Sequence, residues 1–180
     1  MRSPGWRTLG RRRVYRNPWM TVFEDRVRRP DGSAGTYGVV EVGDAVSIVA
    51  LDRGRVCLVG QYRHSWGKRV WEVPCGGLHK GESPLKAARR ELLEEAGMTA
   101  RRWRGLGCVE ANDPIVNRFR LFLATGLAFG RHQRDESEAD MVHRMWSLSD
   151  FNRAVLNGRI CDDMTIACVA KCLMVLGRRL

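Results

Sequence analysis

The sequence lacks several features that would each place it in a special class of protein. It contains no run of about 18 consecutive apolar residues, so we expect no segment that spans a membrane. It has no internal repeat and no low-complexity stretch, which argues against disorder and against a fibrous protein. Its 44% hydrophobic and 28% charged residues are typical of a globular domain, and 180 residues can bury a sizeable core without a disulfide or metal.

Lysine is scarce, and the charge of the chain comes from arginine. Only four of the 31 basic residues are lysine, and the net charge is +11. Residues 1–30 hold nine arginines but only two acids, Glu24 and Asp25. A positive surface attracts polyanions such as nucleotides, nucleic acid or anionic lipid. A solvated arginine-rich tail would give the same composition, and the sequence leaves both interpretations open.

Paired cysteines and a secretory signal are also missing. No two of the six cysteines form a C-x-x-C pair, which argues against a zinc site. Cys168 and Cys172 lie one helical turn apart and are expected to pack as small hydrophobic residues. Residues 1–16 lack the apolar run of a secretory signal. They are rich in arginine, as mitochondrial presequences are, but their single serine argues against a presequence. We therefore expect reduced thiols and a cytoplasmic protein.

Turn residues and a two-residue apolar period predict that the first half of the chain is mostly sheet. Residues 1–18 are basic and lack a period, so we expect a basic N-terminal arm there and one domain over residues 19–180. Strands are predicted at residues 21–28, 36–42, 45–51, 55–62, 69–73, 103–110, 118–125 and 141–147. Helices are predicted at 149–156, at 164–176 and between an N-cap at Ser83, Pro84 in the first turn and a C-terminal cap at Gly97. This order indicates an α/β fold with a mixed sheet packed between helices.

The first of these helices carries a row of carboxylates. Glu91, Glu94 and Glu95 are spaced i, i+3 and i+4, which places them on one side of the helix. Like charges at this spacing repel each other. A hard divalent cation such as Mg²⁺ would relieve the repulsion by binding the carboxylate oxygens. A solvated acidic face is the alternative for the three glutamates taken alone.

The residues around the carboxylates form a longer pattern, G-x5-E-x7-R-E-U-x-E-E-x-G-U, where U is a bulky apolar residue. Nine positions within the 23 residues 76–98 fit it: Gly76, Glu82, Arg90, Glu91, Leu92, Glu94, Glu95, Gly97 and Met98. This segment resembles the Nudix box, the signature of Nudix hydrolases. The order of strands and helices extends the resemblance over about residues 20–178. The resemblance implies a Nudix-type α/β/α sandwich with a mixed β-sheet.

The resemblance also implies a chemistry. Nudix hydrolases cleave a nucleoside diphosphate linked to another group, with water and with Mg²⁺ or Mn²⁺, and the cations neutralise the diphosphate and acidify the attacking water. The metal ligands implied here are Glu91, Glu94, Glu95 and the backbone carbonyl of Cys75, with Glu91 also counted as catalytic. The residues that would shape the box are Gly76, Glu82, Arg90 and Gly97, with Arg90 holding the glutamate cluster.

Features outside the box resemble the subgroup that hydrolyses ADP-ribose and related nucleoside diphosphate sugars. Pro114 lies 16 residues beyond the box, where such members often carry a proline. The expected substrate-binding residues are Pro114, Arg118, Arg63 as a phosphate ligand and Trp19 as a residue that stacks on a purine. Residues 112–119 depart from the subgroup, which commonly has a glycine after the proline and then an acidic pair, so a nucleotide sugar other than ADP-ribose stays open. Relatives of this type form dimers, so we expect a homodimer.

The general base is expected outside the box. In ADP-ribose-type relatives, a glutamate from a loop after the box helix acts as the general base. Residues 131–140 are predicted to form a polar loop, and they include four acids. We expect Glu136 to be the base and Glu138 a further metal ligand; an acidic surface loop is the alternative. Other possible substrates are NADH, coenzyme A, a dinucleoside polyphosphate or an RNA 5′ end, the last kept open by the arginine-rich arm. A non-catalytic nucleotide-binding module is the alternative from another class, although a sensor has no need of every box glutamate.

Overall fold

The computed structural model describes residues 5–130 and 140–177, which form two compact units. Unit 1 comprises Met1–Asp44 and Glu110–Arg118, and unit 2 comprises Ala45–Val109 and Phe119–Leu180. Most of the predicted strands and all three predicted helices are present, with bounds shifted by a few residues.

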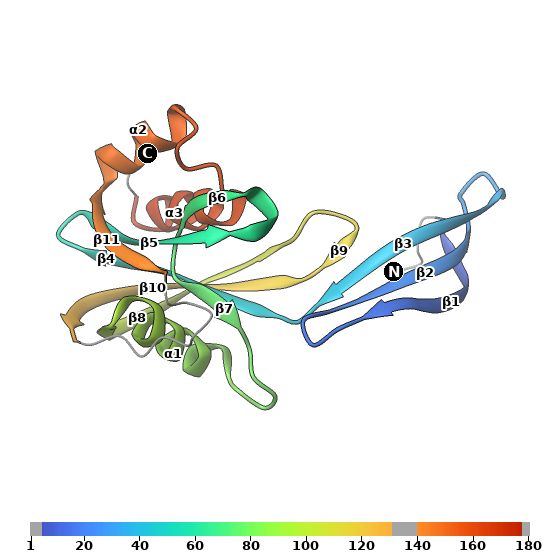
Figure 1. Cartoon of the computed structure of the whole chain (residues 1–180), viewed down its shortest axis with the longest axis horizontal. Helices are drawn as coiled ribbons and strands as arrows, with labels where there is room; N and C mark the ends of the chain where they lie inside the picture. Colours follow the sequence, from blue (N-terminus) through green and yellow to red (C-terminus); the bar gives the residue numbers. More distant parts are fainter. Residues whose placement is uncertain (1–4, 131–139, 178–180) are drawn as a thin grey trace. The chain divides into compact units, whose positions relative to one another are not determined.

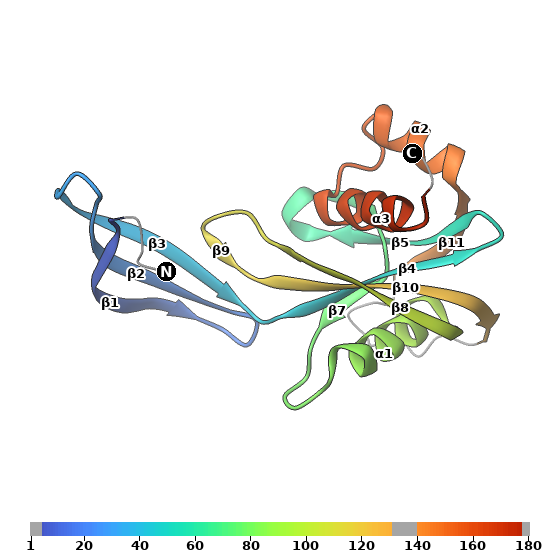
Figure 2. The ribbon, with the colours of Figure 1, turned by 180° about the vertical axis from the view of Figure 1, so that it is seen from behind.

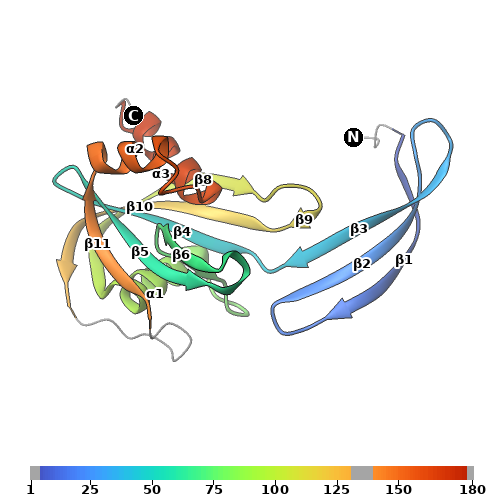
Figure 3. The same cartoon turned by 45° about the horizontal axis from the view of Figure 1, so that its top comes forward.

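Unit 1 is built on a four-stranded sheet with the order β1-β2-β3-β9. Its strands are β1 (Arg7–Arg16), β2 (Met20–Arg28), β3 (Ala34–Val42) and the two-residue β9 (Ile115–Val116). The first three pair antiparallel and lie side by side in Figures 1 and 3, and β9 pairs parallel with β3. The sequence analysis predicted no strand within the basic arm. It missed β1 because this strand is exposed along nearly its whole length and therefore shows no apolar period.

Unit 2 contains a seven-stranded mixed sheet with the order β11-β5-β4-β10-β8. These strands are β4 (Ala45–Asp52), β5 (Arg55–Arg63), β8 (Met98–Glu110), β10 (Arg118–Phe129) and β11 (Val142–Ser147). The two remaining strands, β6 (Lys68–Glu72) and β7 (Cys75–Gly77), lie beside β5 and β4. The parallel pair β4–β10 beside the antiparallel pair β4–β5 confirms the predicted mixed sheet.

Strands β4 and β5 separate soon after the turn that joins them. Their register is confined to Leu51–Val56 and Asp52–Arg55. Further along, β5 pairs with β6 while β4 pairs with β7. The segment that leads into the predicted box therefore fills the space between two diverging strands.

Helices cover both faces of this sheet. In Figures 1 and 2, α1 (Pro84–Ala96) lies on one face, and α2 (Leu148–Leu156) and α3 (Asp163–Val175) lie on the other. Two buried clusters follow the same division: one holds Ala88 and Leu92 of α1, and the other holds Phe151 of α2 and Cys168 of α3. The α/β/α sandwich is confirmed, and Cys168 and Cys172 are buried as expected. Within the described residues, every helix falls short of the length and apolar character that crossing a membrane requires.

Helix α1 begins and ends at the predicted signals. Ser83 is the N-cap, and its side chain accepts a hydrogen bond from the backbone N–H of Lys86 at 3.4 Å. Gly97 ends the helix in the left-handed conformation, with φ of 64°, which a residue with a Cβ adopts only at a cost. The caps fix where the helix starts, and so fix which residues face the sheet.

Candidate functional site

The three box glutamates of α1 differ in their exposure. Glu91 and Glu95 face the sheet and are only 6% and 3% exposed, whereas the side chain of Glu94 is 33% exposed. Burying a carboxylate is costly unless it is paired or hydrogen-bonded. The solvated acidic face, which the sequence left open, therefore does not describe Glu91 and Glu95.

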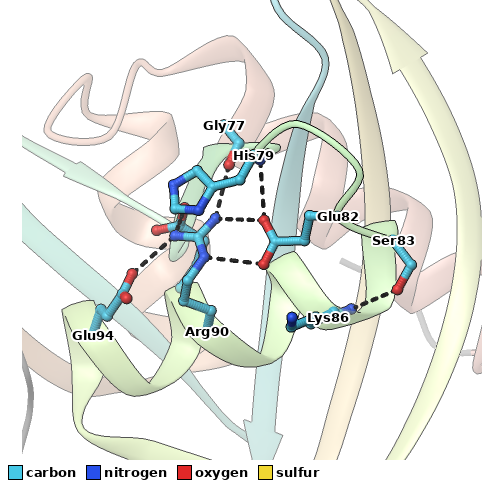
Figure 4. A network of polar contacts seen from close by, with 8 residues as sticks. Gly77, His79, Glu82, Ser83, Lys86, Arg90 and Glu94 are labelled. Carbon is cyan, nitrogen blue, oxygen red and sulfur yellow. Dashed lines mark hydrogen bonds and ion pairs between the residues drawn. The ribbon is translucent and has the colours of Figure 1, made fainter.

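Arg90 forms the centre of a polar network on this helix (Figure 4). Its Nη1 donates to Glu91 Oε1 at 2.7 Å and to Glu94 Oε2 at 2.9 Å. Its Nε and Nη2 bind the two carboxylate oxygens of Glu82 at 3.2 and 3.0 Å. Nη2 also donates to the carbonyl of Gly77 at 2.9 Å. One guanidinium thus connects three carboxylates and the loop before the helix.

The contact with Arg90 sets the protonation of Glu82. The paired hydrogen bonds from Arg90 lower the pKa of Glu82 from 4.5 to about 2, and the backbone N–H of His79, at 3.1 Å, acts in the same direction. A pKa that is lower in the folded than in the unfolded state means that the ionised carboxylate is more stable in the folded protein. Ionisation of Glu82 therefore stabilises the native state. That gain is complete above about pH 4.5 and is lost as the pH falls toward 2.

We expect Glu82→Gln to flatten the acid limb of the stability profile. The free energy of unfolding of the unsubstituted protein should fall between about pH 4.5 and 2, and the variant, which has no proton to take up at this position, should fall less. The measurement is urea unfolding followed by tryptophan fluorescence, in EDTA, at a series of pH values. Parallel profiles for the two proteins would contradict the assignment of this limb to Glu82.

Close contacts between β7 and α1 hold the two buried glutamates in place. The backbone N–H of Cys75 donates to Glu95 Oε2 at 3.0 Å. The carboxylate of Glu91 lies so near the Cα of Gly76 that a Cβ at this position would collide with it. Glycine is needed at residue 76 for this close approach, which gives a physical reason for the first position of the box pattern.

A partly buried acid next to the box, Glu72, was missed by the sequence analysis. Arg63 Nε of β5 donates to Glu72 Oε2 at 2.9 Å, and Arg63 Nη2 forms an ion pair with the same oxygen at 2.7 Å. Burial raises the pKa of Glu72, and the pair with Arg63 opposes that rise. Arg63 was predicted to bind a phosphate, and in this structure its guanidinium binds Glu72. A single acid in a strand carries no spacing signal, and the register of β5 with β6 places Glu72 opposite Val59, so only the side-chain contact in the structure shows that Arg63 and Glu72 meet.

The end of the acidic loop is fixed to the same region. Asp140 Oδ2 accepts from the backbone N–H of Tyr62 at 2.9 Å and from Arg69 Nη2 at 3.4 Å. Arg69 Nη1 also donates to the carbonyl of Asp140 at 2.9 Å. The predicted base Glu136 and the predicted ligand Glu138 lie outside the described residues.

Three predicted substrate-binding residues belong to unit 1. Trp19 is 77% exposed at the turn between β1 and β2, where the side chain of Asn17 accepts from its backbone N–H at 2.9 Å. Pro114 follows a cis peptide bond, and its carbonyl accepts from Val40 N–H at 3.1 Å. Arg118 pairs with Glu110 at 2.8 Å. Their roles toward a substrate stay predictions.

The donor set of α1 suits a hard divalent cation. Carboxylate and carbonyl oxygens are the ligands that Mg²⁺ and Mn²⁺ prefer. In residues 5–130 and 140–177, no three side chains of the metal-binding types stand close enough to form a ready metal site. Glu91 and Glu94 each give an oxygen to Arg90 instead. A bound cation would therefore have to share these carboxylates with Arg90 or take them from it.

Two family models match the chain. Residues 6–40 match a nucleoside diphosphate sugar hydrolase N-terminal domain, and residues 42–159 match the NUDIX domain. The second match contains the whole of α1 and the sheet on which it lies.

Similar proteins cover nearly the whole chain. An ADP-ribose pyrophosphatase of Mycobacterium tuberculosis is 36% identical over 171 residues, which are 93% of this chain and 83% of that protein. An ADP-ribose pyrophosphatase of Bacillus subtilis is 27% identical over 168 residues, 92% of this chain and 91% of that protein. A crystal structure of an ADP compounds hydrolase matches with a TM-score of 0.84 and 19% identity, and covers 97% of both chains.

Proposed function

Because the chain belongs to the Nudix hydrolase family, we propose that it is a pyrophosphohydrolase of ADP-ribose or a related nucleoside diphosphate sugar. Water would add across the diphosphate bridge and give a nucleoside monophosphate and a sugar phosphate. The observation that carries the proposal is the pair of buried carboxylates on α1, Glu91 and Glu95, in a chain similar over most of its length to an ADP-ribose pyrophosphatase. Burying two carboxylates one helical turn apart costs free energy of folding, which favours a functional role for them.

Mg²⁺ or Mn²⁺ is the proposed cofactor, held by Glu91, Glu94, Glu95 and the carbonyl of Cys75. Bound cations would supply neutralisation of the diphosphate charge and activation of water. Arg90 would keep the carboxylates in place through the contacts described above. Gly76 would leave room for the carboxylate of Glu91 beside the backbone. These residues would position the cations and balance the local charge. Catalysis of phosphoryl transfer consists almost entirely of such positioning and electrostatic stabilisation.

Four residues outside the box are the proposed substrate contacts: Trp19, Arg63, Pro114 and Arg118. Trp19, with its exposed ring, is proposed to stack on the base, and Pro114 and Arg118 to shape the site of the distal group. Arg63 is proposed to reach a phosphate oxygen. That role would require its guanidinium to share or leave Glu72, so Glu72 is expected to tune how readily Arg63 binds substrate.

The proposed general base is Glu136, with Glu138 as a further metal ligand. We expect Glu136→Gln to lower kcat by about 10²–10⁴-fold, because the variant cannot accept the proton of the attacking water. Metal binding, measured by Mn²⁺ titration, should be intact. A near-normal rate in this variant would assign the base to another residue.

The substrate is tested by a panel of diphosphates with Mg²⁺ and purified protein. The panel holds ADP-ribose, two nucleotide sugars, NADH, coenzyme A, a dinucleoside polyphosphate and a 5′-triphosphorylated RNA. We expect the highest kcat/KM for ADP-ribose or a nucleotide sugar. Release of a nucleoside monophosphate identifies the bond cleaved. A higher kcat/KM for another class would overturn the substrate assignment, and no hydrolysis of any member would favour a binding module.

A homodimer formed through unit 1 is also proposed. Strand β1 is an edge strand of its sheet, and it and the residues beside it expose Trp6, Leu9, Val14, Tyr15 and Trp19. Exposed apolar side chains along an unpaired edge are typical of an interaction surface. We expect light scattering at micromolar concentration to give twice the chain mass of 20.5 kDa.

A matched pair of variants tests the surface. Leu9→Glu should shift the protein toward the monomer, whereas Leu156→Glu, which places the same charge at an 88% exposed position of unit 2, should not. A monomer for the unsubstituted protein would contradict the proposal.

A further inference from the structure

A cavity of about 440 Å³ lies between β11 and α2, away from the box. Its lining includes Arg144, Trp146, Asp150, Arg153 and Arg159. Strand β11 runs directly into α2, as Figure 3 shows, so both walls come from one continuous segment. Trp146 packs against the buried cluster of α2 and α3, and the box helix packs against the other cluster. The cavity is therefore separated from α1 by the sheet.

The aromatic wall of the cavity is fixed by the strands beneath it. Side chains two residues apart on a strand share a face, so Arg144 and Trp146 point the same way. The rings of Trp146 and Trp71 meet edge to face, with centroids 5.3 Å apart. Trp71 lies across Gly60, where a Cβ would be only 3.1 Å from three of its ring atoms. Glycine at residue 60 thus lets Trp71 lie against β5.

Two guanidinium groups rest on these rings. Arg144 lies over Trp71, 5.5 Å from the ring centroid, and Arg159 lies over Trp146 at 4.9 Å. Within residues 5–130 and 140–177, neither arginine has a carboxylate within ion-pair distance. Stacking on a ring orients a guanidinium and leaves its N–H donors available in the plane. Both arginines therefore keep the capacity for paired hydrogen bonds to an anion.

The third arginine and the one acid of the cavity pair with each other. Arg153 Nη2 binds Asp150 Oδ1 at 2.7 Å, and Asp150 Oδ2 accepts from the hydroxyl of Ser147 at 2.6 Å. Three guanidinium groups thus face a single carboxylate that is already bound. An excess of positive charge in a concave site attracts anions. The volume lies within the range of about 300–1,000 Å³ that is typical of small-molecule sites.

We propose that this cavity is a second ligand site, separate from the box, that binds a small molecule with two adjacent phosphates. Arg144 and Arg159 would each hold one phosphate by paired hydrogen bonds, since a guanidinium matches the geometry of phosphate oxygens. Inorganic pyrophosphate, a nucleoside diphosphate and a sugar bisphosphate share this chemistry. The size of the cavity favours such a ligand over a nucleic-acid chain.

The test is binding of inorganic pyrophosphate to the full chain in EDTA, measured by calorimetry and by NMR of the tryptophan indole N–H groups. Removing divalent cations weakens any binding at the box, and the Trp146 signal together with the arginine variants assigns the remaining binding to the cavity. We expect saturable binding with a shift of the Trp146 signal, identified with Trp146→Phe. Each of Arg144→Gln and Arg159→Gln should weaken binding about tenfold, because each removes a charged hydrogen-bond donor.

A matched control removes the same charge elsewhere in unit 2. Arg104 is exposed on β8 and does not line the cavity, so Arg104→Gln should bind pyrophosphate within about twofold of the unsubstituted protein. Thermal unfolding of each variant checks the fold. Titrations with ADP and with a sugar bisphosphate, compared with pyrophosphate, then identify the preferred source of the phosphates.

Three results would overturn the proposal: no saturable binding, equal losses in Arg104→Gln and the cavity variants, or a signal shift that spares Trp146. Tighter binding of a single-stranded RNA decamer with the same arginine dependence would reassign the cavity to a nucleic acid. Because the assay contains no metal and measures no hydrolysis, its outcome is independent of the activity proposed for the box.

Discussion

Replacement of Arg90 by glutamine is expected to lower the free energy of unfolding by about 2–4 kcal/mol in the absence of divalent cations. The guanidinium is the shared partner of Glu82, Glu91 and Glu94, and two of these carboxylates are almost fully buried. Removing it leaves buried negative charges without compensation, which costs more than the loss of an exposed ion pair. The Arg90 side chain is itself 21% exposed, so the lower part of the range for fully buried pairs applies.

Urea unfolding with and without Mg²⁺ measures this effect. Because a cation at the carboxylates would take over part of the role of Arg90, Mg²⁺ should restore some of the lost stability. Arg89→Gln, one residue earlier on the exposed side of α1, is the matched control and should change stability by less than about 0.5 kcal/mol. Equal losses in the two variants would show that the network contributes nothing beyond helix charge.

Replacement of Glu95 by glutamine is expected to lower kcat/KM by about 10²–10³-fold or more, the scale on which loss of a main electrostatic stabiliser acts in other enzymes. Glutamine has nearly the same shape, and its carbonyl oxygen can still accept the hydrogen bond from the Cys75 N–H. The fold should therefore survive, and the loss should come from weaker cation binding.

The measurement is kcat/KM as a function of Mg²⁺ concentration, with the substrate preferred in the panel. The concentration at half-maximal rate should rise in Glu95→Gln. Asp163→Asn removes a carboxylate from α3, across the sheet, and should leave the Mg²⁺ dependence unchanged. An unaltered Mg²⁺ dependence in Glu95→Gln, together with a normal rate, would remove Glu95 from the set of ligands.

Local signals in the sequence were sufficient for most elements of unit 2. The Ser83 cap and Gly97 bound α1 as predicted, and the turn at Arg53 and Gly54, both with positive φ, joins β4 to β5. These signals act over a few residues, so they can be read without knowing the rest of the fold. Where they are missing, prediction failed: β1 is exposed on both faces, and β9 has two residues.

Part of the candidate site was also predictable, because its central residues are close together in the sequence. The spacing of Glu91, Glu94 and Glu95 follows from helical geometry alone, so the sequence placed them on one side of α1. Which of them are buried depends on the face that packs on the sheet. The pair of Arg63 with Glu72 depends on how the side chains of β5 and β6 pack, and the cavity beside Trp146 depends on rings brought together from β6 and β11.

The sequence by itself determined the positions of the helices, the row of carboxylates and the family resemblance, because each depends on residues that are near one another along the chain. Only the tertiary structure decided that the backbone of Gly76 lies against the carboxylate of Glu91, that Arg63 pairs with Glu72, and that two stacked arginines face a cavity. Those contacts join residues from separate elements. Their geometry is set by packing and strand register, which no local pattern encodes.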